Sequence, residues 1–253
     1  MTRVGVLGAT GKMGRLVCSA IDADPGLVLG AAVNPGAGGK RIGDVTVSES
    51  LDALAEAGVE VAVDFTQPDA VMENVRWLVD HDIHAVVGTT GIGPELLEEI
   101  RGWLEGRPQL GVIVAPNFSV GAVVGQRLAE EAARFFPAAE VIELHHDQKL
   151  DAPSGTAAAT ARRIADARKE SWAGPTGDEA FRGGDFEGVR VHSIRLPGLV
   201  AHQEVIFGAQ GQTLTIRHDA PDRTCYLPGV TLAIREVSRR PGLTVGLEPL
   251  LGL

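Results

Sequence analysis

The chain has 253 residues, of which 44% are hydrophobic and 22% are charged, and its formal net charge at pH 7 is −10. This length and composition predict one or two globular domains of a soluble protein. A nucleic-acid-binding protein would carry a basic patch and a membrane-spanning helix about 18 consecutive apolar residues, and the sequence has neither. Because the sequence has two cysteines, Cys18 and Cys225, and no secretory signal, we expect a cytoplasmic protein without a disulfide framework.

Residues 1–116 alternate between short apolar runs and stretches with helical spacing. The apolar runs predict strands over residues 4–7, 27–33, 59–65, 84–87 and 110–115. The helical stretches between most of them cover residues 13–21, 51–57, 70–79 and 94–103. Apolar strands that alternate with amphipathic helices are typical of a parallel sheet covered on both faces. We therefore predict an α/β fold whose N-terminal domain is a doubly wound, Rossmann-like parallel sheet.

A different pattern begins near residue 118. Helices are predicted over residues 120–134, 154–168 and 232–237, the last of them before a Gly/Pro/Leu-rich tail. Strands are predicted over residues 141–144, 189–195, 202–207 and 213–218, and a loop rich in Gly, Asp and Pro over residues 174–188. Strands joined by short polar turns predict a second domain of the α+β class with a mixed or antiparallel sheet.

The segment GATGKMG, residues 8–14, lies between the first predicted strand and the first predicted helix. Its three glycines are related to the dinucleotide-binding fingerprint. Glycines allow a tight turn and let backbone N–H groups approach a pyrophosphate, which the positive end of the following helix also attracts. The segment can also be a plain turn, but its position between a strand and a helix favours dinucleotide binding.

Dinucleotide-binding domains usually carry an acidic residue about 20 residues after this loop, where it binds the adenine ribose. Here the corresponding residue is Asn34. An amide can hydrogen-bond a ribose hydroxyl and, unlike a carboxylate, does not repel a 2′-phosphate, for which Lys12, Lys40 or Arg41 offers a positive charge. NADH and NADPH both remain open as cofactors, and Asn34 can alternatively belong to a plain turn.

Three other predicted strands end in small, turn-forming or hydrogen-bonding residues. These ends are DFTQP at residues 64–68, GTTG at residues 88–91 and APNF at residues 115–118. Each of them alone is typical of a loop, but ligands of open α/β sheets bind beyond the carboxyl ends of the strands. Together they predict a cofactor crevice at this edge of the sheet.

Residues 140–157, EVIELHHDQKLDAPSGTA, contain the densest group of reactive side chains. His145 and His146 end a predicted strand, Lys149 follows, and Ser154 is a natural N-cap for the next helix. The segment can be a strand end before a capped helix, a metal site of the two histidines with Asp147, or a site of acid–base chemistry on an anionic substrate. Adjacent strand residues point to opposite faces and chelate a metal poorly. We favour acid–base chemistry beside a helix start that binds a carboxylate.

This segment resembles the signature of the 4-hydroxy-tetrahydrodipicolinate reductases, historically called dihydrodipicolinate reductases. The shared pattern over residues 140–157 is Glu-x-x-Glu-x-His-His-x-x-Lys-x-Asp-x-Pro-Ser-Gly-Thr-Ala. The resemblance extends to residues 8–14, 88–91, 115–118 and 199–207, in the family's order, and so covers nearly the whole chain. It implies an oxidoreductase that reduces a cyclic imine dicarboxylate with NADH or NADPH in lysine and diaminopimelate biosynthesis.

The resemblance also implies roles for single residues. His145 corresponds to the acid–base histidine and Lys149 to the proton-donating lysine. His146, Gly155 and Thr156 match positions that contact the substrate carboxylates. The positions expected to bind the cofactor are Gly8, Ala9, Thr10, Gly11, Lys12, Met13, Asn34, Gly88, Thr89, Thr90, Ala115, Pro116, Asn117 and Phe118.

The family's domain layout implies that residues 1–117 and 222–253 form the dinucleotide-binding domain. Residues 118–221 would then form a substrate-binding and oligomerisation domain, and the protein would be a homotetramer assembled through the sheets of these domains. Many relatives carry an acid where this chain has Asn34, so the cofactor preference stays open. Arg195 and Arg223 either meet a substrate carboxylate or cover the surface, and we expect the surface for both.

Two other functions are compatible with many of the same residues. Another amino-acid or imino-acid dehydrogenase would act on a different substrate with the same architecture. A non-catalytic regulator would bind NAD(P)H without turnover, but it would have no use for His145 and Lys149. We expect the reductase, with no metal ion and with no nucleic-acid or membrane partner.

Overall fold

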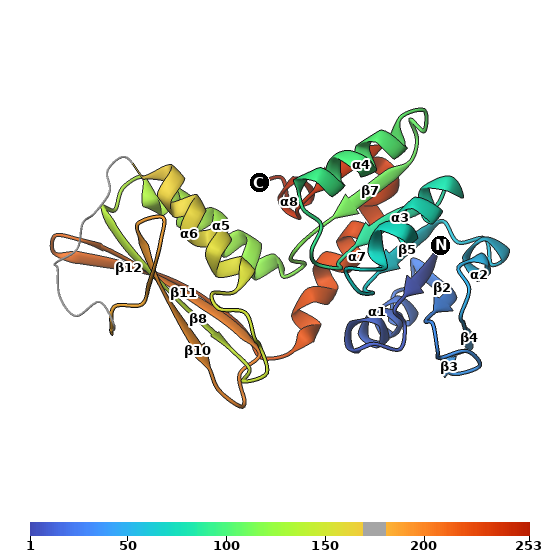
Figure 1. The fold of residues 1–253 in the computed structure, drawn as a ribbon, viewed down its shortest axis with the longest axis horizontal. Helices are drawn as coiled ribbons and strands as arrows, with labels where there is room; N and C mark the ends of the chain where they lie inside the picture. Colours follow the sequence, from blue (N-terminus) through green and yellow to red (C-terminus); the bar gives the residue numbers. More distant parts are fainter. Residues whose placement is uncertain (169–180) are drawn as a thin grey trace. The chain divides into compact units, whose positions relative to one another are not determined.

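The computed structural model describes residues 1–168 and 181–253. The chain divides into two compact units: the first unit is Met1–Ser119 with Tyr226–Leu253, and the second unit is Val120–Cys225 (Figure 1). No helix in the described residues has the length and apolarity that crossing a bilayer requires. The nucleotide role predicted for residues 1–117 and 222–253 and the substrate role predicted for residues 118–221 stay predictions.

The first unit is built on an 8-stranded sheet in the order β13-β7-β6-β5-β1-β2-β4-β3. Its strands are β1 (Thr2–Leu7), β2 (Leu27–Val33), β3 (Arg41–Ile42), β4 (Val45–Ser48), β5 (Val61–Asp64), β6 (His84–Val87), β7 (Gly111–Val114) and β13 (Gly242–Val245). Its helices are α1 (Lys12–Ala23), α2 (Asp52–Glu56), α3 (Val71–Asp80), α4 (Pro94–Leu104), α7 (Leu227–Glu236), η3 (Val237–Arg239) and α8 (Glu248–Leu251). Neighbouring strands are parallel except for β3 and β4.

The central strands of this sheet are covered on both faces. Every residue of β5 and β7 is buried, as expected for strands that lie between two layers of helices. The helices turn their apolar sides to the sheet, as α3 does with the buried residues Val71, Val75 and Leu78. The doubly wound parallel sheet predicted from the sequence is confirmed.

The second unit contains a 5-stranded sheet in the order β12-β11-β8-β10-β9. Its strands are β8 (Ala138–His145), β9 (Gly184–Phe186), β10 (Val189–Arg195), β11 (Ala201–Ala209) and β12 (Gln212–Ala220). Its helices are α5 (Val120–Ala133) and α6 (Gly155–Ala167), and the short helix η2 (Arg223–Tyr226) follows the last strand. Since β8 and β10 are parallel and the other neighbours antiparallel, the sheet is mixed, as predicted.

Helices α5 and α6 lie side by side on one face of this sheet (Figure 1). Along β8, the buried residues Ala139, Val141 and Glu143 alternate with half-buried ones, so the buried side chains point to the helices. Val205 and Phe207 of β11 are buried in the same way. Among the described residues, no helix covers the opposite face, which carries the half-buried side chains.

The structure corrects the sequence prediction in several short segments. Within the predicted loop over residues 174–188, Gly184–Phe186 form β9 beside β10, while residues 174–180 lie outside the described part of the chain. The last long helix begins at Leu227 instead of residue 232, and the predicted tail contains β13 and α8. Residues 41–48, for which the sequence predicts no element, hold the antiparallel pair β3 and β4. These elements are too short or too rich in glycine to show a clear period.

Candidate active site

Glycines shape the loop between β1 and α1. Gly8 has a φ of +73°, which L side chains rarely adopt. A Cβ on Gly14 would lie 2.1 Å from the Gly8 carbonyl oxygen, so α1 can begin this close to the loop only if residue 14 has no side chain. The N-cap of α1 is Gly11, no side chain caps this helix, and its first turn holds no acidic residue. The N–H groups at this end are therefore suited to bind an anion.

The predicted phosphate-binding residues lie together in this loop. Gly11 and Lys12 are exposed, Thr10 and Met13 half-buried, and Gly8 and Ala9 buried. Lys12 is the first residue of α1, where a positive charge opposes the helix dipole. A bound anion would offset both the charge and the dipole, which makes this position of Lys12 consistent with a phosphate site.

A buried carboxylate holds the loops that follow β5 and β6. Asp64 ends β5 and is fully buried. Its Oδ1 accepts hydrogen bonds from Thr66 N (2.9 Å) and Thr66 Oγ1 (2.7 Å), and also from Thr89 Oγ1 (2.8 Å). Its Oδ2 accepts a bond from Asn74 Nδ2 at 2.8 Å. The two loops are thereby tied together. The sequence analysis did not single out Asn74. The signal for its contact with Asp64 is a polar residue among the apolar positions of α3.

Two predicted cofactor residues turn their side chains into the protein. The Thr89 hydroxyl is bonded to Asp64, and the buried Phe118 ring lies 5.9 Å from the Phe65 ring, measured between centroids. Gly88 leaves room for Phe65, since a Cβ there would lie 2.2 Å from that ring. Thr89 and Phe118 can therefore meet a ligand only through their backbone groups.

The other residues of these loops lie at the same edge of the sheet, after β6 and β7. Thr90 and Pro116 are exposed, whereas Ala115 is buried. The N–H of Ala115 donates to Val87 O (3.0 Å), which joins the two strand ends. Asn117 is half-buried, and its Oδ1 accepts the N–H of Ser119 at 2.9 Å.

Asn34 follows β2 and belongs to a turn. Its N–H donates to Ser48 O (2.9 Å), its carbonyl accepts the N–H of Ala37 (3.1 Å), and its Nδ2 donates to Pro35 O (3.0 Å). The preceding residue, Val33, accepts the N–H of Gly8 at 2.9 Å. The backbone at Asn34 is thus a turn, and this turn lies next to the glycine loop.

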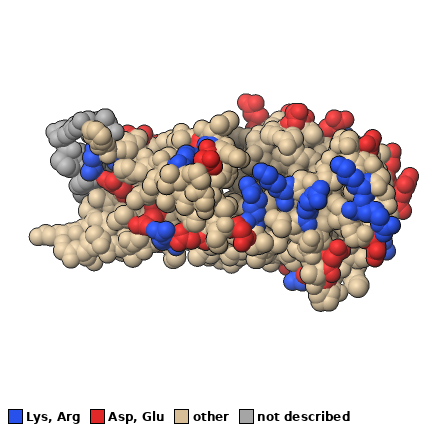
Figure 2. Space-filling model, turned by 90° about the horizontal axis from the view of Figure 1, so that it is seen from below, with Lys and Arg blue, Asp and Glu red and all other residues tan. Residues whose placement is uncertain are grey.

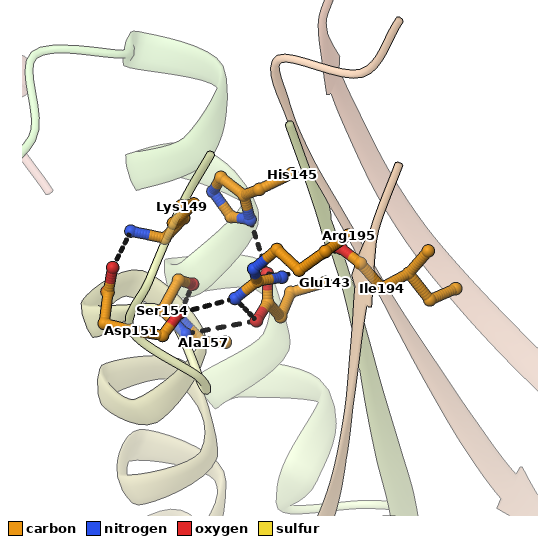
Figure 3. A network of polar contacts seen from close by, with 8 residues as sticks. All are labelled: Glu143, His145, Lys149, Asp151, Ser154, Ala157, Ile194 and Arg195. Carbon is orange, nitrogen blue, oxygen red and sulfur yellow. Dashed lines mark hydrogen bonds and ion pairs between the residues drawn. The ribbon is translucent and has the colours of Figure 1, made fainter. Parts of the chain in front are cut away.

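In the second unit, the residues predicted for catalysis meet at the end of β8 (Figure 3). His145 is the last residue of β8, and its Nδ1 is hydrogen-bonded to Glu143 Oε2. Lys149 lies in the following loop, with its Nζ 2.8 Å from Asp151 Oδ1. The side chains of His145 and Lys149 are 15% and 22% exposed, so both remain accessible. Within the described residues, no group of three or more His, Cys, Asp or Glu side chains is arranged to hold a metal ion.

The start of α6 lies beside these side chains. Ser154 is the N-cap, and its Oγ accepts the N–H of Ala157 at 3.1 Å, as the sequence predicts. Gly155, the first residue of the helix, is exposed, and a Cβ placed on it would have no atom within 4 Å. Thr156 is half-buried. An open helix N-terminus of this kind attracts a carboxylate.

The expectation that Arg195 lies on the surface is wrong. Its side chain is 18% exposed, and its guanidinium donates two hydrogen bonds to Glu143, of 2.7 Å and 2.9 Å. Strands β8 and β10 pair in parallel with Arg195 opposite His145, which brings the guanidinium into the site. The sequence did not reveal that Glu143 and Arg195 pair, since this contact depends on the register of two strands.

His146 faces the same region as a ring that favours its neutral form. Burial lowers its pKa, and the positive charges of Arg223, His145 and Lys149 lower it further. Its Nδ1 is buried and has no hydrogen-bond partner among the described residues. Arg223 is half-buried and acts on His146 through its charge, so it does not simply cover the surface. His146 therefore has one ring nitrogen without a hydrogen-bond partner in the described part of the chain.

Two family models match the chain in sequence order. The model described as "Dihydrodipicolinate reductase, N-terminus" matches residues 2–118, and the one described as "Dihydrodipicolinate reductase, C-terminus" matches residues 121–251. The chain belongs to the dihydrodipicolinate reductase family. It is therefore an NAD(P)H-dependent oxidoreductase, and the resemblance noted in its sequence is confirmed.

Individual relatives of the family are similar over the full chain. A 4-hydroxy-tetrahydrodipicolinate reductase of Nocardia farcinica is 54% identical over 257 residues, which cover 99% of each chain. One of Mycolicibacterium smegmatis is 50% identical over 255 residues, again 99% of each chain. Among solved structures, a dipicolinate-bound dihydrodipicolinate reductase from Paenisporosarcina sp. TG-14 is 38% identical with a TM-score of 0.87, covering 98% of this chain and 99% of that one.

Replacing Gly14 with alanine should weaken NADH binding. The new methyl group would press on the Gly8 carbonyl oxygen and move α1 away from the loop. We expect the Kd for NADH, measured by fluorescence titration, to rise about tenfold or more. The matched control is Gly102→Ala in α4, where a Cβ has no atom within 4 Å and the Kd should stay within about twofold. A Gly14→Ala variant that binds NADH like the wild type would contradict the phosphate role of the loop.

Proposed function

We propose that the protein reduces 4-hydroxy-tetrahydrodipicolinate, or dihydrodipicolinate in its dehydrated form, to tetrahydrodipicolinate in lysine and diaminopimelate biosynthesis. The observation that carries this proposal is the position of His145, which buried Glu143 holds beside Lys149 and the open start of α6. A proton donor, a cation and a carboxylate-binding helix end thus share one place. The names of the relatives and the dipicolinate bound to the solved relative support the same substrate class.

Reduction of a conjugated imine adds a hydride and a proton to the substrate ring. The reduced nicotinamide supplies the hydride when it is bound. His145 supplies the proton. The Lys149 ammonium, kept in place by Asp151, stabilises the negative charge that develops on the substrate and can also donate a proton.

The substrate carboxylates bind at the first turn of α6. The exposed Gly155 lets a carboxylate approach the helix end, where Thr156 also lies. His146 adds a ring nitrogen that has no other partner among the described residues. These groups hold the substrate ring in one orientation, which lowers the entropic part of the barrier.

The cofactor binds at the carboxyl edge of the first unit's sheet. The residues present fit a dinucleotide, because the glycine loop has no side chain at residues 8, 11 and 14 and α1 has no side-chain cap. The phosphates would be held by Gly8, Ala9, Thr10, Gly11, Lys12 and Met13. The rest of the cofactor would be lined by Gly88, Thr89, Thr90, Ala115, Pro116, Asn117 and Phe118.

Both NADH and NADPH serve as reductants. Asn34 lies next to the glycine loop and carries no charge that would repel a 2′-phosphate. Lys12, Lys40 and Arg41 are exposed and offer positive charge to such a phosphate.

A carboxylate at residue 34 should therefore select against NADPH. For the wild type we expect kcat/KM values for NADH and NADPH within about tenfold of each other. In Asn34→Asp, repulsion of the 2′-phosphate should lower kcat/KM for NADPH about tenfold or more, while the value for NADH, as the internal control, changes less than about threefold. An equal change in kcat/KM with both nucleotides would show that Asn34 does not lie near the 2′ position of the bound cofactor.

The acid–base assignment is tested by His145→Ala and Lys149→Ala. Removal of a general acid typically costs about 10²–10⁴ in rate, so kcat should fall by that factor in an NADH absorbance assay with enzymatically generated substrate. The control His81→Ala changes an exposed histidine of the first unit and should keep the wild-type rate. Wild-type rates in both site variants would refute the assignment. Turnover of a different keto- or imino-acid alone would favour another dehydrogenase.

The protein forms a homotetramer through the second unit's sheet. The face that α5 and α6 leave open carries the half-buried side chains of Ile142, Ile194 and Ile206. The adjoining edge strand β12 has no charge between residues 212 and 216, although exposed edge strands usually carry charges. Figure 2 shows no charged side chain at the tip of the β11–β12 hairpin, at the left end of the view. A second copy of the chain would cover these apolar groups.

A charge in this open face should break the assembly. Ile206→Asp places a carboxylate opposite Glu140, in a face that a partner would bury, and so adds a second negative charge there. Sedimentation velocity should show a tetramer for the wild type and smaller species for the variant. Leu128→Asp, at a residue of α5 that is 53% exposed, is the control and should remain tetrameric. A monomeric wild type at micromolar concentration would refute the proposed assembly.

A further inference from the structure

The carboxylate of Glu143 is surrounded by donors from three elements. Glu143 lies in β8 and is fully buried. Its Oε1 accepts hydrogen bonds from Arg195 Nη2 in β10 (2.7 Å) and from the N–H of Ser154 before α6 (3.2 Å). Its Oε2 accepts bonds from Arg195 Nη1 (2.9 Å) and from His145 Nδ1. Figure 3 shows His145 and Arg195 converging on this one side chain.

These donors keep Glu143 ionised. Burial by itself raises the pKa of its carboxyl group, but the hydrogen bonds from His145, Arg195 and Ser193 outweigh burial and lower the pKa to about 2. The carboxyl group therefore stays negative throughout the neutral pH range. An ionised carboxylate can only accept hydrogen bonds, so the ring nitrogen of His145 that faces it must carry a hydrogen.

This contact decides which nitrogen of His145 exchanges a proton. With Nδ1–H donated to Glu143, Nε2 is the nitrogen that gains and loses the proton. We propose that Glu143 is a positioning residue that holds His145 in the Nδ1–H tautomer and thereby makes Nε2 the proton donor to the substrate. The inference rests on the proposed reduction and deepens it, because it adds a residue to which no role in proton transfer has been assigned.

Arg195 makes this arrangement possible. Its fork of two N–H groups fills one acceptor position on each oxygen of Glu143. Its Nη2 also donates to the Asp151 carbonyl oxygen (2.7 Å), which fixes the guanidinium to the loop before α6. With the guanidinium bonded to it, Glu143 stays ionised inside the protein and accepts the hydrogen bond from His145 Nδ1.

The charges around His145 come from several elements. Lys149 and His146 lie in the segment that follows β8, and Arg223 of η2 adds positive charge at His146. Asp151 is bonded to Lys149, and Arg195 is bonded to Glu143. The Glu143 carboxylate thus supplies negative charge next to the ring among several cations. Loss of this charge should destabilise the imidazolium form of His145.

Glu143→Gln tests this role, since it keeps the shape of the side chain and removes the charge. The glutamine amide would face Nδ1 and favour the other tautomer. We expect kcat to fall about tenfold or more, because a catalytic histidine in the wrong tautomer or position loses efficiency. The high-pH limb of the kcat profile should move to lower pH by about one unit. The Kd values for NADH and for dipicolinate should stay within about threefold.

Glu140→Gln is the matched control. Glu140 lies in the same strand and also bonds to an arginine and a histidine, Arg182 Nη2 at 2.6 Å and His192 Nε2 at 2.9 Å. It points to the other face of the sheet, the one proposed for self-association, so sedimentation velocity must first show that the variant assembles like the wild type. The assembled variant should keep the wild-type kcat and pH profile. The inference would be overturned if the Glu143→Gln variant had the wild-type kcat and the high-pH limb of its kcat profile stayed at the wild-type pH. Loss of dipicolinate binding with an unmoved limb would also overturn it, because Glu143 would then only support the fold.

A direct measurement decides the matter even if Glu143→Gln does not fold. The full-length wild-type protein is labelled with 15N-histidine, and the His145 signals are identified by their loss in His145→Gln. At a pH where the ring is neutral, the 15N shifts should show the hydrogen on Nδ1. A hydrogen on Nε2 would refute the inference. This result does not depend on turnover, so an inactive wild type would contradict the proposed function alone.

Discussion

A negatively charged carboxylate is stable inside a protein only where donors replace the water that it loses. Glu143 meets this condition through Arg195, the N–H of Ser154 and His145. Removing the arginine would leave a buried charge without its partner, which typically costs about 3–5 kcal/mol. The donors come from β10, the segment before α6 and the end of β8. The ion pair of Glu143 and Arg195 therefore joins His145 and the start of α6, the two groups proposed for acid–base chemistry and carboxylate binding.

The first unit uses a buried carboxylate in a different way. Asp64 is surrounded by neutral donors, the groups of Thr66, Thr89 and Asn74, and no cation is bonded to it among the described residues. These bonds join the loops after β5 and β6, so the edge proposed for the cofactor is held rigidly. In both units, a carboxylate near a strand end organises the loops and leaves neighbouring residues, such as Thr90, exposed to a ligand.

The two sheets also differ in what covers them. Parallel strands need crossover connections, and in the first unit the crossover helices cover both faces. The second unit connects β11 and β12 by a hairpin and has only α5 and α6 as long helices among its described residues, so one face has no second layer. The half-buried isoleucines there, such as Ile142 and Ile206, explain why self-association is the proposed role of this face.

The sequence alone determined those features that depend on residues close together in the chain. The strand–helix alternation, the glycine loop at residues 8–14 and the capped helix after Ser154 follow from local spacing, and the His145 segment was enough to suggest the family. Only the tertiary structure decided that Arg195 pairs with Glu143, 52 residues away, and that the Thr89 side chain turns inward. The physical reason is that an ion pair between two strands depends on their register, which the packing of the whole sheet sets and no local pattern encodes.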